Sequence, residues 1–199
     1  MPYIRECIVT TTDKNGKVHI APLGIIAEND GWIIAPFRPS TTLDNLTQIP
    51  FAVASYTDDV RIFAGCLTSR KDWPLAPIDG CAVPRLRAAL AHSVLQVVRV
   101  GDDGVRPRHF CRVVSEASHA PFTGLNRARA AVLELAILVS RLGMLRREKI
   151  EMEIEYLTIA IEKTAGPEEQ EAWGWLMERV TQHFAGKAAN GEDVRAAKS

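Results

Sequence analysis

Residues 4–27 read IRECIVTTTDKNGKVHIAPLGIIA and hold two β-strand patterns around one tight turn. The first pattern, Ile4–Thr12, is a run rich in β-branched residues, which are typical of strands. Asn15-Gly16 follows, a pair that favours a short hairpin turn because both residues tolerate positive φ. The second pattern, Val18–Ala27, contains Pro22, which has no N–H for a ladder hydrogen bond. We therefore expect an antiparallel hairpin with an edge, a bulge or a ligand-facing kink at Pro22.

Further strand patterns follow at fairly regular spacing and are separated by turn residues. They cover Trp32–Phe37, Phe51–Tyr56, Val60–Cys66, Val94–Val100 and His109–Ser115, the last two joined by a turn at Asp102–Gly104. The stretch Thr68–Pro84 is rich in Pro and is expected to form a long surface loop. About seven short strands with turns between them favour a barrel or a sandwich over a parallel α/β sheet.

Helical patterns dominate after residue 120. Apolar residues recur at helical spacing over Leu125–Leu145 and Glu148–Lys163, and a third helix is expected to open at Gly166-Pro167 and to include Trp173–Phe184. The sequence thus predicts an α+β chain, with a mainly β barrel or sandwich followed by about three C-terminal helices. The expected divisions are residues 1–120 for the β part, 121–185 for the helical segment and 186–199 for a flexible tail.

Composition excludes several classes of function. Lys and Arg number 24 and Asp and Glu also number 24, so no net positive charge favours nucleic acid as a partner. No apolar run reaches the roughly 20 residues that span a bilayer, and the first residues lack a signal-peptide pattern, so we expect a cytoplasmic protein without a membrane partner. The four cysteines form no CxxC pair and the five histidines show no ligand spacing, so we expect buried thiols and no metal site.

The segment Arg38-Pro39-Ser40-Thr41-Thr42 has the chemistry of a phosphate site. It lies between a strand and a short predicted helix, Ser40–Leu46, which Ser40 or Thr41 would cap and Pro50 would stop. A helix N-terminus offers unpaired amides and a positive dipole end, and Arg38 can bind an oxyanion through two N–H groups. The alternative is that the hydroxyl groups only cap the helix and that Arg38 is solvated.

Two other segments are candidate ligand contacts. Residues 19–24 place Ala21, Pro22, Leu23 and Gly24 in one strand, where small residues would expose backbone to a planar ligand; an edge strand with a bulge explains them equally well. Asn126 and Arg127 stand at the joint between barrel and helices, where they could bind a ring carbonyl or a phosphate. Alternatively, Asn126 caps a helix and Arg127 is in solvent.

No GxSxG, P-loop or GxGxxG motif is present, so the usual serine hydrolase, NTPase and Rossmann readings lack support. Instead, the order of the segments resembles the domain-of-unknown-function 447 (DUF447) family of FMN-binding split-barrel proteins. The resemblance covers about residues 3 to 182. It is carried by residues 6–11, 19–24, 36–46, 56–60 and 121–128, continuing into 134–138 and 162–164; residues 69–92 match poorly.

The resemblance implies a barrel like that of flavin reductases, a homodimer, and FMN bound near the subunit interface. On this basis Arg38, Ser40, Thr41 and Thr42 hold the phosphate, and Ala21–Gly24 offer backbone to the isoalloxazine. Its remaining candidate ligands are Asn45, Asn126 and Arg127.

The function that the resemblance implies is that of an FMN-dependent oxidoreductase, with no catalytic side chain assigned because the flavin performs the redox chemistry. A nicotinamide or a pterin is the expected second substrate, and members of the family are common where one-carbon metabolism uses methanopterin. Two alternatives stay open. One is a non-catalytic flavin-binding or interaction protein in a cofactor pathway, and the other is a barrel that binds a different phosphorylated or planar ligand.

Overall fold

The structure, a computed structural model, describes residues 2–101 and 104–189. These residues form two compact units. Among the described residues, the barrel unit comprises 2–58, 71–101 and 104–123, and the helical unit comprises 59–70 and 124–189. The chain therefore enters the helical unit twice.

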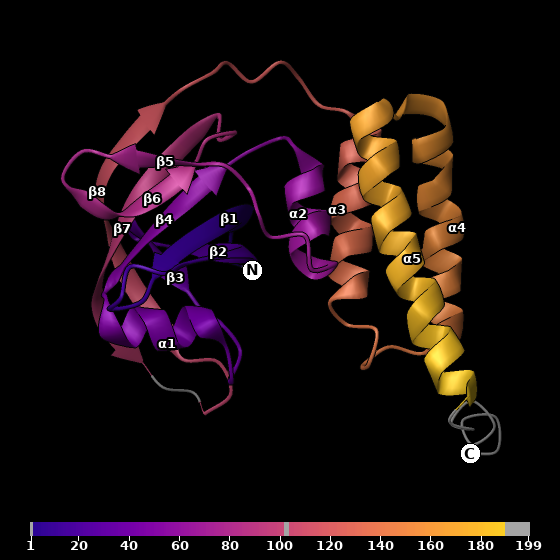
Figure 1. Cartoon of the computed structure of the whole chain (residues 1–199), viewed down its shortest axis with the longest axis horizontal. Helices are drawn as coiled ribbons and strands as arrows, with labels where there is room; N and C mark the ends of the chain where they lie inside the picture. Colours follow the sequence, from indigo (N-terminus) through magenta and orange to yellow (C-terminus); the bar gives the residue numbers. More distant parts are fainter. Residues whose placement is uncertain (1, 102–103, 190–199) are drawn as a thin grey trace. The chain divides into compact units, whose positions relative to one another are not determined.

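Six antiparallel strands close into a barrel in the barrel unit (Figure 1). Their order around the barrel is β1 (Ile4–Thr12), β2 (Val18–Glu28), β3 (Gly31–Ile34), β8 (Arg108–Ser118), β7 (Ala91–Gly101) and β4 (Phe51–Tyr56). The β1–β2 hairpin turns at the predicted Asn15-Gly16, and Gly16 has a φ of 80°. Of the predicted turn at Asp102–Gly104, residues 102 and 103 lie outside the described residues.

Alternate residues of the strands fill the barrel. Cys7 and Val9 of β1, Ile25 of β2 and Ile34 of β3 meet in one buried cluster, as the period-2 pattern of a strand requires. Helix α1 (Thr41–Gln48) lies across one end of the barrel in Figure 1 and adds Leu46 to this cluster. The core thus anchors the helix whose N-terminus is the candidate phosphate site.

Four helices form the described part of the helical unit. They are α2 (Val60–Leu67), α3 (Arg127–Val139), α4 (Arg147–Thr164) and α5 (Pro167–Ala189). Val60 and Ala64 of α2 share a buried core with residues of α3, α4 and α5, among them Leu135, Ile150 and Leu176. The three predicted C-terminal helices are therefore confirmed, and Pro167 occupies the first helical position as expected.

Two predictions of local structure were wrong. Val60–Cys66 is not a strand: it lies within α2, whose N-cap Asp59 accepts a hydrogen bond from the Arg61 N–H at 3.1 Å. Thr68–Pro84 is not a structureless loop, because it contains β5 (Leu75–Ile78) and part of β6 (Cys81–Leu86), which pair as a separate two-stranded sheet. That sheet is held to the barrel wall, where the Thr10 hydroxyl donates to the Pro84 carbonyl at 2.6 Å.

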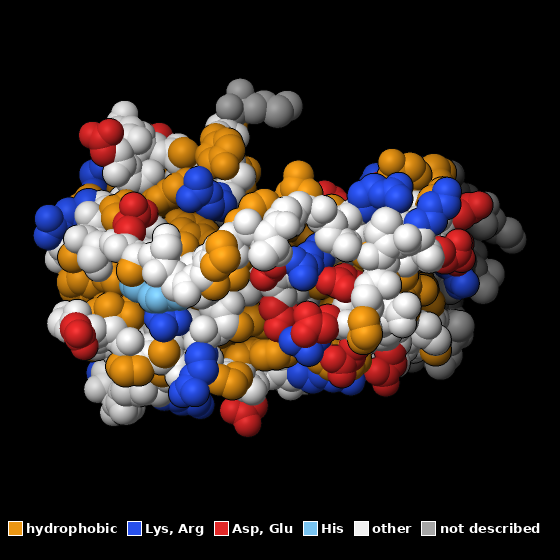
Figure 2. All heavy atoms as spheres, turned by 90° about the horizontal axis from the view of Figure 1, so that it is seen from above, with side chains coloured by type: hydrophobic (Ala, Val, Ile, Leu, Met, Phe, Trp, Pro, Cys, Tyr) orange, Lys and Arg blue, Asp and Glu red, His pale blue; other side chains and the backbone are white. Residues whose placement is uncertain are grey.

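The mainly β barrel followed by helices is confirmed as the fold class. The division at residue 120 stays a prediction, and residues 59–70 belong to the helical unit. Of the expected tail, α5 extends to Ala189 and residues 190–199 lie outside the described residues. Within the described chain no helix is long and apolar enough to cross a membrane. Figure 2 shows basic and acidic side chains interspersed over the face in view.

Candidate functional site

The N-terminus of α1 is the candidate phosphate site that the sequence predicts. Ser40 is its N-cap, with extended φ and ψ of −157° and 145°, and its Oγ accepts a hydrogen bond from the Leu43 N–H at 3.3 Å. The amides of Thr41 and Thr42 come earlier in the same turn, where a helix has no carbonyl of its own to receive them. Two backbone donors and the positive end of the helix dipole therefore meet at this point.

The side chains around this turn differ in what they can offer. Arg38 and Thr41 are exposed, whereas Thr42 is only 2% exposed, so Thr42 is better placed to act through its amide than through its hydroxyl. Asn45 is also buried, and its Nδ2 donates to the Thr11 Oγ1 of β1 at 3.0 Å. Asn45 thus ties α1 to the barrel wall. The helix cap predicted at Ser40 is confirmed, while the roles of these residues toward a ligand stay predictions.

Arg106 stabilises the segment that leads into α1, and the sequence alone does not predict this role. Its Nε and one terminal nitrogen donate to the Ala35 carbonyl at 3.0 and 2.8 Å, and its guanidinium lies 4.3 Å from the centre of the Phe37 ring. The Arg38 N–H donates to the Val105 carbonyl at 3.4 Å. These contacts fix the backbone directly before Arg38.

The edge expected at Pro22 is confirmed. β2 pairs with β1 in continuous register from Val18 to Ile26, but with β3 only at Ile26–Glu28. Among the described strands, Val18–Ile25 therefore has β1 as its one neighbour, and the register shows no bulge at Pro22. The backbone of Ala21–Gly24 has one edge that no described strand covers.

Gly24 and His19 lie on this part of β2, and the surroundings of each are well defined. A Cβ built on Gly24 would come within 2.8 Å of the Ile4 Cγ2 and 2.9 Å of the Glu6 Oε1, so the missing side chain gives room to β1. His19, half-buried on the same strand, has a pKa below its ordinary value of 6.5 because burial disfavours the cation and Lys71 adds repulsion. The imidazole is therefore neutral at pH 7.

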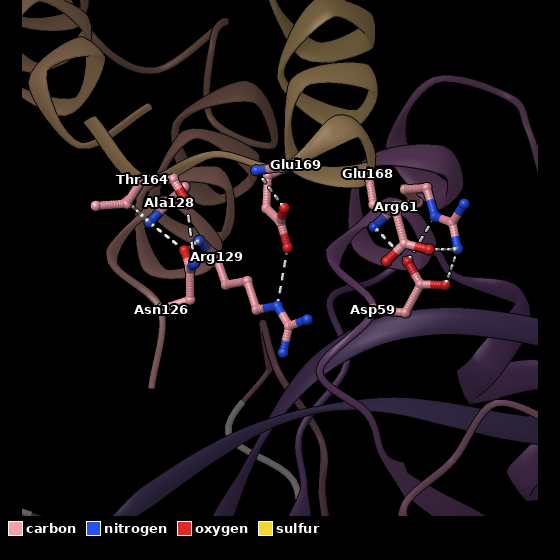
Figure 3. A network of polar contacts seen from close by, with 9 residues as sticks. Asp59, Arg61, Asn126, Ala128, Arg129, Thr164, Glu168 and Glu169 are labelled. Atoms are coloured by element: carbon pink, nitrogen blue, oxygen red, sulfur yellow. Dashed lines mark hydrogen bonds and ion pairs between the residues drawn. The ribbon is translucent and has the colours of Figure 1, made fainter. Parts of the chain in front are cut away.

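Asn126 and Arg127 lie in the helical unit. Figure 3 shows Asn126 at the start of α3, where its Oδ1 accepts from the N–H groups of Ala128 and Arg129 at 2.7 and 3.2 Å. Its Nδ2 donates to the Thr164 carbonyl at 3.0 Å. Both ends of this amide are therefore engaged in protein contacts, as the capping alternative predicts. Arg127 is exposed and borders a groove between α3 and α4.

A second polar network in Figure 3 explains why the helical unit holds its shape. The Arg129 Nε donates to the buried carboxylate of Glu169 at 2.9 Å, and the Gly166 N–H donates to the other oxygen at 2.9 Å. Arg61 of α2 pairs with Asp59 at 2.7 Å and with Glu168 of α5 at 2.9 Å. These contacts join helix ends and are structural.

Two family models match the chain. One, described as the N-terminal domain of the protein of unknown function DUF447, covers residues 5–120, and the other, described as protein of unknown function (DUF447), covers residues 126–178. No curated protein matches the sequence.

Several solved structures are similar. An FMN-bound protein of Methanosarcina mazei with the DUF447 family model aligns with a TM-score of 0.76 and 19% identity, over 88% of this chain and 94% of the other. The 2-nitrobenzoate 2-nitroreductase of Pseudomonas fluorescens aligns with a TM-score of 0.50 and 20% identity, over 59% of this chain and 64% of the other. An FMN-binding protein of Thermus thermophilus aligns with a TM-score of 0.50 and 15% identity, over 60% of this chain and 73% of the other. At these identities the likeness shows a shared split-barrel fold.

Proposed function

The chain belongs to the DUF447 family, and we propose that it is a flavoprotein that binds FMN on its barrel unit. The observation that carries the proposal is the donor set at the start of α1: the Arg38 guanidinium, the Ser40 and Thr41 hydroxyls, and the amides of the first turn. A phosphate dianion needs several N–H and O–H donors and a nearby positive charge, and this set fits it. FMN carries such a group at one end.

The uncovered edge of β2 supports a place for the rest of the cofactor. Backbone N–H and C=O groups at the edge of Ala21–Gly24 can bond the polar rim of a flavin ring, because only one side of this strand is paired. The resemblance to FMN-binding split barrels implies the same role for this segment, which supports the proposal. Asn126 is not needed in this arrangement, since its amide is bonded within the helical unit; Asn45 and Arg127 stay weaker candidates.

We further propose that the chain is an oxidoreductase and a homodimer. FMN, when bound, supplies hydride and electron transfer, so the protein's part is to bind and orient it. Arg38 neutralises the phosphate and the strand edge orients the ring. The nitroreductase with the same barrel supports a redox role. More specifically, we propose that the second substrate is a nicotinamide or a pterin, the latter as in methanopterin-linked one-carbon metabolism.

An absorbance scan of the purified protein from about 300 to 550 nm tests the cofactor. We expect flavin bands that stay with the protein through gel filtration, either as purified or after FMN is added. Protein that retains no flavin after reconstitution would contradict the proposal. Flavin that binds but that no nicotinamide donor reduces would keep the FMN site and remove the oxidoreductase role.

The phosphate site is tested by removing the charge of Arg38. Arg38→Ala should weaken FMN binding roughly 10- to 100-fold, because a hydrogen bond to a charged group contributes about 1.5–3 kcal/mol. Quenching of FMN fluorescence gives the dissociation constant. Arg112→Ala is the matched control, since that exposed arginine bonds Gln96 on β7. Unchanged affinity in Arg38→Ala would refute the role of this residue.

A further inference from the structure

A groove between α3 and α4 remains without an assigned role in the helical unit. This α3–α4 groove has a volume of about 310 Å³ and is bordered by Arg127, Ala130, Ala131 and Glu134 of α3 and by Tyr156 and Ile159 of α4. Ala130 is exposed, and its small side chain lets another helix approach α3 closely. The proposed phosphate and ring contacts at α1 and β2 do not involve this groove, and of its lining residues only Arg127 is a candidate, and a weaker one, for FMN.

The outer face of α4 is apolar where it borders the groove. Met152, Tyr156 and Ile159 recur at i, i+4 and i+7, so they form one stripe along the helix. Their side chains are 68%, 75% and 47% exposed. The opposite face, with Ile150 and Ile161, already packs in the core of the helical unit, and Leu157 lies between that core and the groove. A second apolar face on one helix is typical of a surface that another protein covers.

The charges beside the groove are self-complementary. Arg127 and Glu134 lie on the exposed side of α3 on either side of Ala130, two turns or about 10 Å apart. In the described part of the helical unit neither side chain has an ion-pair partner. A two-fold axis through α3 near Ala130 would place Arg127 of each copy opposite the partner's Glu134, which forms two ion pairs at once.

We propose that the α3–α4 groove is covered by the same groove of a second copy of this chain. The two α3 helices pack antiparallel across Ala130, and the α4 stripes close over the contact. Small residues at a helix crossing permit the close approach, while the exposed Tyr156 and Ile159 supply apolar area. This contact adds to the homodimer proposed above, and it does not depend on flavin.

Charge reversal tests the pairing in the full chain. By sedimentation velocity, Arg127→Glu and Glu134→Arg should each weaken self-association about tenfold or more, because each puts like charges opposite one another twice. The double variant Arg127→Glu/Glu134→Arg should restore association to within a few-fold of the original. A double variant as weak as the single variants, or single variants that associate normally, would overturn the proposal.

A cysteine cross-link distinguishes this contact from one made by the barrels. In a Cys81→Ser background, which leaves the buried Cys7, Cys66 and Cys111, Ala130→Cys should form an intermolecular disulfide under mild oxidation, since Ala130 lies at the axis. The control is Met144→Cys, at a residue 75% exposed and outside the groove. Cross-linking no greater than in the control would overturn the proposal. Flavin absorbance of the same samples reports separately on the FMN site.

Discussion

Ser40 has two separable roles at the N-terminus of α1. Its hydroxyl caps the helix by accepting from the Leu43 N–H, and it also belongs to the proposed phosphate site. Ser40→Ala should cost about 1 kcal/mol of unfolding free energy through the lost cap and should also weaken FMN binding. Ser40→Asp should keep the cap, because Asp is a preferred N-cap residue, yet repel the phosphate.

The two Ser40 variants are compared by urea unfolding and by FMN titration. Affinity lost in Ser40→Asp with stability kept would establish the phosphate role independently of the cap. If Ser40→Asp binds FMN as tightly as the original chain, the phosphate lies elsewhere.

Glu169 is expected to make stability depend on pH. Burial raises the pKa of this carboxyl, but the hydrogen bonds from Arg129 and from the Gly166 amide outweigh it, so the pKa lies below the ordinary 4.5. The ionised form is therefore favoured by folding. Its contribution is fully present above the ordinary pKa and is lost as the pH falls through the lowered one.

Glu169→Gln should accordingly destabilise the chain at pH 7, and the difference from the original chain should shrink below about pH 4. Denaturant unfolding of both proteins at pH 7 and at several lower pH values, down to about pH 4 and below, measures this difference in unfolding free energy. Glu171→Gln is the control. Glu171 is exposed on the same helix, and its Oε2 lies 3.9 Å from a terminal nitrogen of Arg61. A difference that persists at low pH would show that Glu169 acts through its shape and not its charge.

The sequence alone predicts those residues of the candidate site whose contacts are close in the sequence. It does not predict the contacts between residues that are far apart in the sequence. Ser40 was predicted as a cap because a hydroxyl three residues before a helical N–H is a local pattern. Arg106 was not found, since its acceptor, the Ala35 carbonyl, is 71 residues away. Asn45 was assigned to the cofactor by resemblance, and its bond to Thr11 appears only once α1 is placed against β1.

At the scale of elements, β3 and β8 approach so closely that a glycine is required. A Cβ built on Gly31 would lie 2.2 Å from the Cys111 carbonyl oxygen, a backbone atom that cannot move aside. Gly31→Ala should destabilise the barrel by about 1–3 kcal/mol, the usual cost of overpacking. Gly174→Ala is the matched control, because its Cβ meets no atom within 4 Å on α5.

Thermal and denaturant unfolding measure both glycine variants. Gly174→Ala should stabilise the chain by about 0.5–1 kcal/mol, since alanine loses less freedom in a helix than glycine. An unfolding free energy that Gly31→Ala leaves unchanged would mean that β3 can move away from β8.

The elements that were predicted wrongly show where local pattern fails. Val60–Cys66 has the β-branched and aromatic composition of a strand, but Asp59 caps it as a helix and its apolar side chains meet those of α3 and α5. Asp79-Gly80 within Thr68–Pro84 is a hairpin signal, and Gly80 does adopt a φ of 74°. Pro74, Pro77 and Pro84 surround this signal, and because proline is disfavoured in strands the segment resembles a loop. Strands bounded by clear turns, such as Ile4–Thr12 and Phe51–Tyr56, were predicted to the residue.

At the scale of the whole molecule, the path of the chain matters more than the boundary near residue 120. The chain leaves the barrel unit after Asp58, contributes α2 to the helical unit, and returns at Lys71. Val60 and Ala64 of α2 are buried in the core with Leu135 and Leu176. The helical unit is therefore not a simple C-terminal addition, because one of its helices is inserted in the sequence of the barrel.

This insertion predicts how truncation will act. A chain that ends at Thr123 keeps α2 but loses α3, α4 and α5, so Val60, Ala64 and Leu67 are left without the core they pack in. An apolar helix face stripped of its cover promotes association, and we expect the truncated chain to aggregate in gel filtration. Truncation after Ala189 removes no described residue and should leave the elution unchanged.

A rescue variant distinguishes exposure of α2 from general instability of the barrel. Replacing Val60, Ala64 and Leu67 by Lys in the chain that ends at Thr123 should restore a single soluble species, because the uncovered face becomes polar. If that chain also retains FMN, the barrel unit folds and binds the cofactor by itself. If the unmodified truncation is already soluble and of one size, α2 does not need the helical core, and its burial with Leu135 and Leu176 contributes little to solubility.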